Sequence, residues 1–253
     1  MVTNYLDNNH LKLVGRILSE KKFSHEIYGE SFYVFDIEVP RLSGSVDLIP
    51  ITISERLITS FELEIGKSIS IEGQFRSYNS YENERNRLVL TVFAKDITDV
   101  KIEEVTENEE NNETENVENT VEQSENKEVK KQEDHSNEVV LRGYVCKKPI
   151  YRQTPFGREI ADILLAVNRA YNKSDYIPCI CWGRNARFCQ DLEVGKEVKI
   201  YGRVQSRVYE KKIDENTTIK KVAYEVSVAN MEIIEKESNE NDENIEIQNE
   251  NAV

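Results

Sequence analysis

The chain contains 253 residues, a length that predicts two domains of about 100 residues each rather than one compact core. Charged residues make up 32% of it and hydrophobic residues 38%, with only 10 Gly and 5 Pro, which excludes collagen-like and Pro/Gly-rich low-complexity proteins. No stretch approaches the roughly 20 apolar residues of a membrane helix, and residues 1–7 lack the basic and apolar pattern of a secretory signal. We therefore expect a soluble, cytoplasmic protein.

The net charge of −14 is distributed unevenly. Residues 1–100 carry 11 basic and 15 acidic side chains, whereas residues 139–234 carry 17 basic and 11 acidic side chains. The remaining negative charge lies in residues 101–138 and 235–253, two segments without an aromatic residue. Because a nucleic-acid binder needs Lys and Arg to displace counterions from phosphates, the acidity of the whole chain argues against such a partner. Only residues 139–234 have the positive charge for one.

The two acidic segments are predicted to be disordered. Residues 101–138 are rich in Glu and Asn and contain too little apolar surface to offset the entropy of ordering, so we interpret them as an acidic linker. Residues 235–253 are interpreted as an acidic tail on the same grounds. The alternative for the linker is a solvated helix, which a Glu-rich sequence tolerates. We rank it second because Val117 and Val121 do not belong to a sustained apolar stripe.

Residues 1–100 and 139–234 contain matching segments. Segments 13–17, 28–29 and 48–50 match segments 141–145, 156–157 and 176–178, all at one offset in residue number. Farther along, segment 63–67 and Gly73 match segment 192–196 and Gly202 at a second offset, which is larger by a single residue. So small a drift over about sixty positions is hard to obtain by chance, so the sequence predicts two copies of one domain.

Short runs of Val, Ile, Phe and Tyr between turn residues predict an all-β structure for each copy. The strands predicted in the second copy cover residues 139–147, 160–170, 175–182, 197–209 and 222–233. A short helix is predicted over residues 185–192, where apolar residues recur at helical spacing before Gly195. Five strands with a helix between the third and fourth follow the element order of an OB-fold barrel, an order that also fits other small barrels. The predicted fold is therefore all-β, with two five-stranded OB-fold barrels joined by the acidic linker.

Alternation along residues 176–182 places Tyr176 and Trp182 on one face of a strand and Cys179 and Cys181 on the other. We interpret the cysteine face as core. Flat aromatic surfaces interleaved with cations are what binding of a single-stranded nucleic acid requires. Parity alone leaves Trp182 equally compatible with a core position and with a stacking platform.

Along residues 202–209, the side chains of Arg203, Gln205, Arg207 and Tyr209 share a face, which we interpret as the lining of a groove. Cations on a strand face are usually just solvated, so the excess of positive charge over the whole second copy is the better evidence for a polyanionic ligand.

Several segments of the second copy form a pattern in their order and spacing over about 95 residues. They are residues 142–145 (Arg-Gly-Tyr-Val), 149–157 (Pro-Ile-Tyr-Arg-Gln-Thr-Pro-Phe-Gly), 165–171 (Leu-Ala-Val-Asn-Arg-Ala-Tyr), 175–183 (Asp-Tyr-Ile-Pro-Cys-Ile-Cys-Trp-Gly), 195–196 (Gly-Lys) and 202–207 (Gly-Arg-Val-Gln-Ser-Arg). This pattern resembles that of the bacterial single-stranded DNA-binding protein family. Through the internal repeat the first copy resembles the family more weakly, so the resemblance extends over about three quarters of the chain.

The resemblance implies a non-enzymatic protein that binds single-stranded DNA without strong sequence preference in replication, recombination and repair, with no cofactor and no metal. It implies two groups of ligand contacts. The base-stacking aromatics are Tyr171, Tyr176, Trp182 and Tyr209, and the cationic contacts are Arg152, Arg169, Arg203 and Arg207. Tandem members of the family reach four OB domains as a homodimer. The family tail usually ends in an acidic tip with Pro-Phe that docks replication or repair proteins, whereas this chain ends in Ala252 and Val253, which leaves recruitment through that tip in question.

The first copy is poorer in stacking residues. Leu48, Ser54 and Ser80 stand where the second copy has aromatic candidates, although Arg76 remains as a possible phosphate contact. We therefore hypothesise that residues 1–100 are mainly structural and that residues 139–234 carry most of the affinity for a single strand.

Other functions remain open at this point. A primosomal or adaptor OB-fold protein would have a partner protein or RNA as its main ligand, and stacking platforms do not distinguish RNA from DNA. A nuclease or RNA-processing enzyme is disfavoured, because the groove strands carry no carboxylate cluster and no His or Cys nucleophile arrangement. The cysteines form no CxxC pair and few histidines accompany them, which argues against a zinc site or a disulfide framework. They are Cys146, Cys179, Cys181 and Cys189, with His10, His25 and His135.

Overall fold

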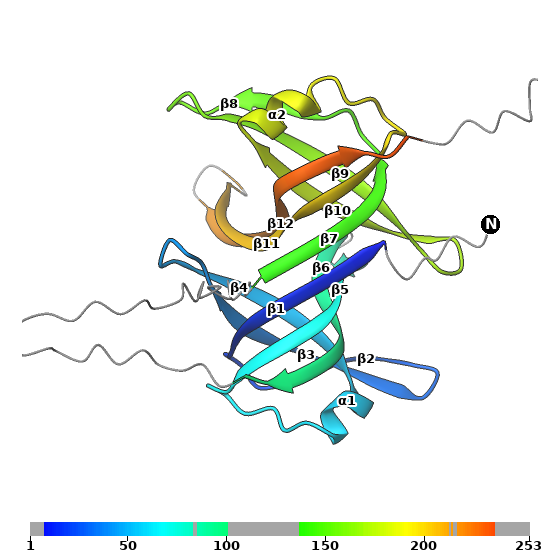
Figure 1. Cartoon of the computed structure of the whole chain (residues 1–253). Helices are drawn as coiled ribbons and strands as arrows, with labels where there is room; N and C mark the ends of the chain where they lie inside the picture. Colours follow the sequence, from blue (N-terminus) through cyan, green and yellow to red (C-terminus); the bar gives the residue numbers. More distant parts are fainter. Residues whose placement is uncertain (1–7, 83–84, 101–136, 213, 215–216, 236–253) are drawn as a thin grey trace, which may run out of the picture.

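The structure is a computed structural model that describes residues 8–82, 85–100, 137–212, 214 and 217–235. These residues form twelve strands and two short helices (Figure 1). The predicted acidic linker and acidic tail lie outside the described residues, apart from their edges. No helix in the described ranges is long and apolar enough to cross a membrane.

The elements fall into two halves with the same order. The first half contains β1 (Asn9–Ile17), β2 (Lys22–Ile27), β3 (Glu30–Pro40), β4 (Val46–Ser54), α1 (Glu55–Thr59), β5 (Ser68–Glu82) and β6 (Arg85–Asp99). The second half contains β7 (Asn137–Val145), β8 (Ile150–Gln153), β9 (Glu159–Arg169), β10 (Lys173–Trp182), α2 (Arg184–Cys189), β11 (Glu197–Lys212) and β12 (Thr218–Ile233). The internal repeat is therefore present as a repeat of structure.

Each half closes into a five-stranded barrel. The sheet order β3-β4-β6-β5-β1 is closed by the pairing of β3 with β1, and the order β7-β11-β12-β10-β9 by the pairing of β7 with β9. Inward positions of the strands are occupied by Ile, Val, Leu and Phe, including Phe35 and Phe75 in the first barrel and Leu165 and Ile177 in the second. The predicted fold class of two OB-fold barrels is confirmed.

The structure adds detail that the strand prediction lacked. The short strand β8 pairs only with β9, outside the closed barrel, and its residues are mostly exposed, so no apolar alternation predicts it. Strands β11 and β12 are longer than predicted because their far ends pair with each other as a two-stranded arm, as far as Lys212 opposite Thr218. The helix α2 ends at Cys189, before the predicted end, and Leu192 is buried beyond it.

The two barrels share one continuous sheet. Strands β1 and β7 pair antiparallel, with Asn9 opposite Leu141, Leu11 opposite Val139 and Leu13 opposite Asn137. When each residue is exchanged for its counterpart in the other copy, the pair Asn9–Leu141 becomes the pair Asn137–Leu13. The pairing of β1 with β7 therefore has local two-fold symmetry about the pair Leu11–Val139. A single chain therefore contains a pseudo-dimer of OB barrels.

The matching glycines of the repeat mark the points where a strand crosses closely over its neighbour. Both β5 and β11 have an irregularity in register at this point, between Glu72 and Gly73 and between Tyr201 and Gly202. A Cβ atom at Gly73 or Gly202 would lie only 2.3 Å from a backbone carbonyl oxygen of the paired strand. Any larger residue would push the strands apart, which explains why glycine occurs at this position in both copies.

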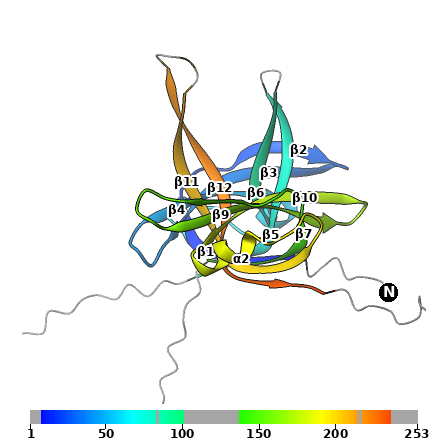
Figure 2. The same cartoon turned by 90° about the horizontal axis from the view of Figure 1, so that it is seen from above.

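Beyond these bulges the β5–β6 and β11–β12 hairpins continue as long arms that project from the same side of the molecule (Figure 2). The base of each arm passes the other barrel: β5 contacts β10, and β11 contacts β4. The groove face of one barrel is therefore bordered by an arm of the other.

Candidate nucleic-acid interface

The outward face of the second barrel is formed by β11, β12, β10, β9 and β8. On β10, Ile177, Cys179 and Cys181 are buried, whereas Tyr176 is 45% and Trp182 40% exposed. The parity predicted for this strand is confirmed. Trp182 lies at the surface, opposite Ile160 of β9, and is not a core residue. Two aromatic rings are thus displayed on one face of one strand.

Cationic side chains lie on β11, which is separated from β10 in the sheet by β12. Arg203, Gln205 and Arg207 alternate along β11, and Gln205 and Arg203 lie opposite Glu225 and Ser227 of β12. The guanidinium carbon of Arg207 lies 5.9 Å from the ring centroid of Tyr209. A strand crossing β10 would therefore meet cations on β11 as well as aromatic rings.

Each of three predicted cationic contacts lies near a carboxylate. Arg152 of β8 pairs with Asp162 at 2.8 Å, Arg207 with Glu225 at 3.6 Å, and Arg203 with Asp47 of the first barrel at 3.4 Å. Only the Arg152–Asp162 pair is exposed on both sides, and such pairs contribute about 0–1 kcal/mol, so a phosphate can replace that carboxylate at small cost. Glu225 and Asp47 are buried, and Arg203 and Arg207 can therefore meet an anion only with the exposed part of their side chains.

Two predicted contacts lie apart from this cluster. Tyr171 is at the tip of the β9–β10 hairpin, 94% exposed and in the left-handed region with φ of 61°. Arg169 lies at the end of β9, with its Nε 3.2 Å from Asp175 Oδ2. These residues line the edge of the site, next to the first barrel, rather than its centre.

Asp175 is fully buried and joins the two barrels. The Ser77 N–H of β5 donates to Asp175 Oδ1 at 2.7 Å, and the Tyr176 N–H donates to Ser77 Oγ at 2.7 Å. Burial raises the pKa of Asp175, and the Ser77 backbone N–H and the charges of Arg169 and Arg76 oppose that rise. This contact fixes the start of β10 against β5 and thereby sets the position of Tyr176.

The same contact occurs a second time with the barrels exchanged. Asp47, also fully buried, accepts hydrogen bonds from the Ser206 N–H at 2.6 Å and from both Nε and Nη2 of Arg41, and the Leu48 N–H donates to Ser206 Oγ at 3.1 Å. Arg41 and Asp47 correspond to Arg169 and Asp175 at the first repeat offset, and Ser77 corresponds to Ser206 at the second. We call these two contacts the interdomain fasteners. These contacts were not predicted from the sequence, although their residues recur at the repeat offsets.

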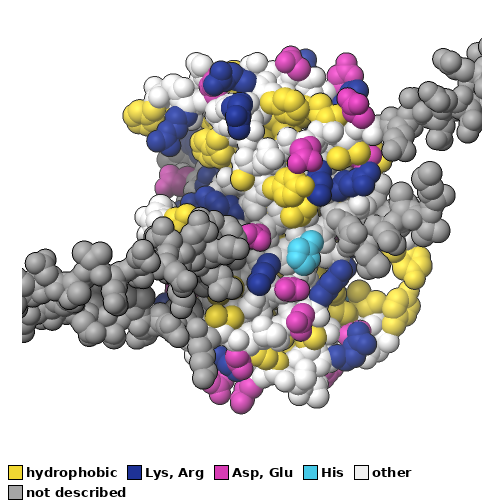
Figure 3. Space-filling model, in the orientation of Figure 1, with side chains coloured by type: hydrophobic (Ala, Val, Ile, Leu, Met, Phe, Trp, Pro, Cys, Tyr) yellow, Lys and Arg dark blue, Asp and Glu magenta, His cyan; other side chains and the backbone are white. Residues whose placement is uncertain are grey.

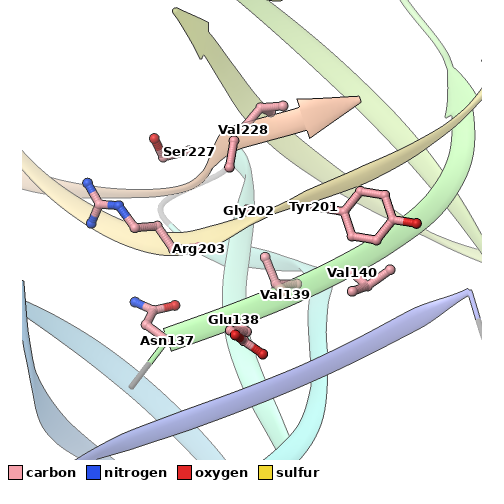
Figure 4. A pocket seen from close by; sticks show the side chains of 10 residues that line it. Asn137, Glu138, Val139, Val140, Tyr201, Gly202, Arg203, Ser227 and Val228 are labelled. Atoms are coloured by element: carbon pink, nitrogen blue, oxygen red, sulfur yellow. The ribbon is translucent and has the colours of Figure 1, made fainter. Parts of the chain in front are cut away.

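A hollow of about 420 Å³ lies beside the groove, where β7 begins next to β11 and β12 (Figure 4). Asn137 seals one side, since its side-chain amide donates to the Val204 carbonyl at 2.7 Å and accepts from the Val204 N–H at 2.9 Å. The lining contains one carboxylate, Glu138, one cation, Arg203, and neither His nor Cys. The hollow therefore offers no nucleophile with an adjacent base.

The opposite face, which carries β1 and β7, mixes basic and acidic side chains (Figure 3). On this face Arg142 pairs with Glu197 at 2.7 Å, and the Nζ atom of Lys199 lies 5.0 Å from the ring centroid of the half-buried Tyr201. What distinguishes the outward face of β10 is thus the exposed pair Tyr176 and Trp182, rather than the number of cations.

The described residues contain no group of three or more His, Cys, Asp or Glu side chains arranged to hold a metal ion. Cys179, Cys181 and Cys189 are buried, and burial raises the pKa of the Cys179 thiol. They pack as small apolar side chains in the core, as predicted for Cys179 and Cys181.

Residues 136–234 match the family model described as the single-strand binding protein family. Over 96 residues the chain is 33% identical to single-stranded DNA-binding protein B of Bacillus subtilis, a match that covers 34% of this chain and 82% of that protein. The chain belongs to the single-strand binding protein family. The family resemblance seen in the sequence is confirmed.

Other members of the family are matched over a shorter part of their length. The chain is 37% identical over 81 residues to single-stranded DNA-binding protein 2 of Listeria innocua, which covers 29% of this chain and 51% of that protein. It spans 57% of the single-stranded DNA-binding protein of Clostridium tetani, at 37% identity over 83 residues. Several curated relatives are thus matched over only about half of their length.

A solved structure is similar over both barrels. The wild-type single-stranded DNA binding protein from Thermus aquaticus superposes with a TM-score of 0.62 at 16% identity, covering 90% of this chain and 93% of that one. This similarity shows a shared fold of two OB barrels in one chain.

Proposed function

We propose that this protein binds single-stranded DNA without strong sequence preference. The observation that carries the proposal is the pair Tyr176 and Trp182, both exposed on β10 in the same sheet as the arginines of β11, in a chain of the single-strand binding protein family. Exposed rings accept any base on their faces, and neighbouring cations contact the phosphates without reading sequence.

In the proposed complex Tyr176, Trp182 and Tyr209 stack bases. Arg152 exchanges its carboxylate partner for a phosphate, and Arg203 and Arg207 contact phosphates with the exposed parts of their side chains. Tyr171 and Arg169 extend the site along the β9–β10 hairpin towards the first barrel. The charge favours this assignment, because residues 139–234 carry 17 basic and 11 acidic side chains whereas the chain as a whole is acidic.

The proposal includes a division into domains. Residues 1–100 form the first OB domain, residues 139–234 the second and main binding domain, and the acidic segments 101–138 and 235–253 the linker and the tail. The protein acts as a homodimer with four OB domains, without enzymatic activity or cofactor. It works in the cytoplasm with the nucleoid, in replication, recombination and repair.

The test is a binding comparison of the whole chain with four ligands of equal length: oligo-dT, a mixed-sequence single strand, the corresponding duplex, and oligo-U. We expect the two DNA single strands to bind within a few-fold of each other and the duplex to bind much more weakly. Stronger binding of the duplex would contradict the proposal, and a clear preference for oligo-U would reassign the ligand to RNA. Absence of binding to all four would favour a partner-protein ligand.

A further inference from the structure

The first barrel also has aromatic rings in this region, but they come from different strands, and they are less exposed: Phe32 is only 7% exposed and Phe93 is half-buried. Ser54 occupies the position of Trp182, yet Phe32 of β3 lies directly opposite Ser54 in the β3–β4 pairing. Phe93 of β6 occupies the position that Ser227 has on β12, since Phe93 faces Thr52 and Ser227 faces the equivalent Ile180. Rings on the neighbouring strands β3 and β6 thus lie near the position where the first barrel has Ser54 in place of a tryptophan.

These rings form one continuous stack. The exposed ring of His25 lies nearly parallel to Phe32, with centroids 4.9 Å apart and an interplanar angle of 12°. Phe32 lies 5.7 Å from Phe93, and the Arg76 guanidinium carbon is 3.9 Å from the centroid of Phe93. A series of π surfaces that ends in a cation is the arrangement that accommodates a base with its phosphate.

An open hollow of about 430 Å³ adjoins this stack. Phe32 and Phe93 line it together with Ser54 and Lys95, and the pair of Glu30 with Arg56 at 2.9 Å closes its other side. The hollow is therefore aromatic at one wall and carries a lysine at its rim.

The cations of this face have fewer carboxylates near them than those of the second barrel, although the buried Asp175 lies close enough to Arg76 to interact with its charge. Thr91 faces Arg76 where Glu225 faces Gln205 in the second barrel, and Thr91 hydrogen bonds to Thr52 at 2.8 Å. Within the described part of the chain no ion pair involves Lys95.

Arg76 donates to the neutral Gln74 side chain at 2.7 Å. Burial, together with the charge of Arg76, lowers the pKa of Lys95. Burial and the charge of Arg169 lower the pKa of Arg76, and the charge of Asp175 opposes this shift. An anion placed between Lys95 and Arg76 would relieve this repulsion.

We propose that the first barrel contains its own nucleotide site, with the base in the hollow against the half-buried ring of Phe93, which the buried Phe32 supports, and the phosphate at Lys95 and Arg76. The ligand is a nucleotide unit of the same single strand that the second barrel binds, so the inference rests on the proposed function. It modifies the hypothesis that the first barrel is mainly structural: the second barrel remains the main binding domain and the first holds an additional segment of a long strand.

The experiment uses the full chain and oligo-dT carrying 5-iodouracil, in a length that fills one barrel and in a length that fills both. Ultraviolet cross-linking followed by peptide mapping identifies which barrel contacts the strand. Quenching of Trp182 fluorescence reports the second barrel separately. The variant Lys95→Glu is compared with Lys12→Glu, which makes the same charge change at an exposed position of β1.

We expect cross-links to peptides containing Phe32 or Phe93 with the long strand. Lys95→Glu is expected to remove them and to weaken binding of the long strand about tenfold, which corresponds to about 1.4 kcal/mol. The short strand should bind Lys95→Glu unchanged, and Lys12→Glu should behave as the parent chain.

Trp182 quenching with cross-links confined to the second barrel, and equal affinities for Lys95→Glu and Lys12→Glu, would overturn this inference while leaving the proposed function intact. Absence of both quenching and cross-links in the unmodified chain would overturn the proposed function and this inference with it.

Discussion

The two barrels are held together by the same residues on both sides but differ on the faces they present. Asp47 and Asp175 make equivalent fasteners, and Gly73 and Gly202 mark equivalent bulges. By contrast, exposed aromatic rings lie on β10 in one barrel, whereas in the other the buried Phe32 of β3 lies between the exposed His25 of β2 and the half-buried Phe93 of β6. The contacts between the barrels have therefore kept the symmetry of a dimer, whereas the surfaces free of that constraint have diverged.

The largest predicted effect comes from removing the rings of β10. The double variant Tyr176→Ala and Trp182→Ala should lose about 2–6 kcal/mol of single-strand binding, because each stacked base contributes about 1–3 kcal/mol. Binding is measured by fluorescence anisotropy of a labelled oligo-dT. The matched control, Leu48→Ala, changes the residue of the first barrel that aligns with Tyr176 and should lose less than about 0.5 kcal/mol. A loss from Leu48→Ala as large as that from the double variant would contradict the difference between the faces.

The next effect tests the shared fasteners. Asp47→Ala and Asp175→Ala should each lower the free energy of unfolding by about 1–3 kcal/mol, because each leaves a buried serine N–H and an arginine without their partner. Urea denaturation of the full chain provides the measurement. Asp162→Ala, which breaks the exposed pair with Arg152, should cost less than about 1 kcal/mol. A large cost on one side and none on the other would show that the fasteners are not equivalent.

The smallest predicted effect distinguishes an arginine that contacts phosphate, Arg207, from one that mainly stabilises the fold, Arg169. Arg207→Gln should reduce the salt dependence of single-strand binding, lowering the slope of log affinity against log salt by about 0.7 for one lost phosphate contact. Arg169→Gln should change this slope less and lower the unfolding free energy more, because Arg169 lies beside the buried Asp175. The reverse order would place Arg169, rather than Arg207, in the path of the strand.

The sequence predicted features that depend on local pattern. Turn residues, glycines and apolar runs recur at two nearly equal offsets, and this recurrence predicted two copies of one domain. The strand pattern together with the family resemblance predicted that each copy is an OB barrel. Alternation along β10 was sufficient to place Trp182 and Tyr176 on the face opposite Cys179 and Cys181.

Features that depend on contacts distant in sequence were not predicted. Asp47 contacts Ser206 from the other barrel, and nothing in the neighbourhood of either residue indicates the other. The rings of the first barrel were missed because aligned positions were compared one by one, whereas Phe32 replaces Trp182 from the adjacent strand. Strand β8 was not predicted because an exposed edge strand does not need alternating apolar residues.

The central claim is that a single strand lies on the face of β10, and Trp182, the only tryptophan of the chain, reports on that face directly. The measurement is a titration of the whole protein with oligo-dT, following Trp182 fluorescence at several salt concentrations. We expect strong quenching and an affinity that falls as salt rises, since a base would stack at Trp182 and phosphates would lie on the arginines. Binding at low salt without any change in Trp182 fluorescence would place the strand elsewhere and contradict the claim.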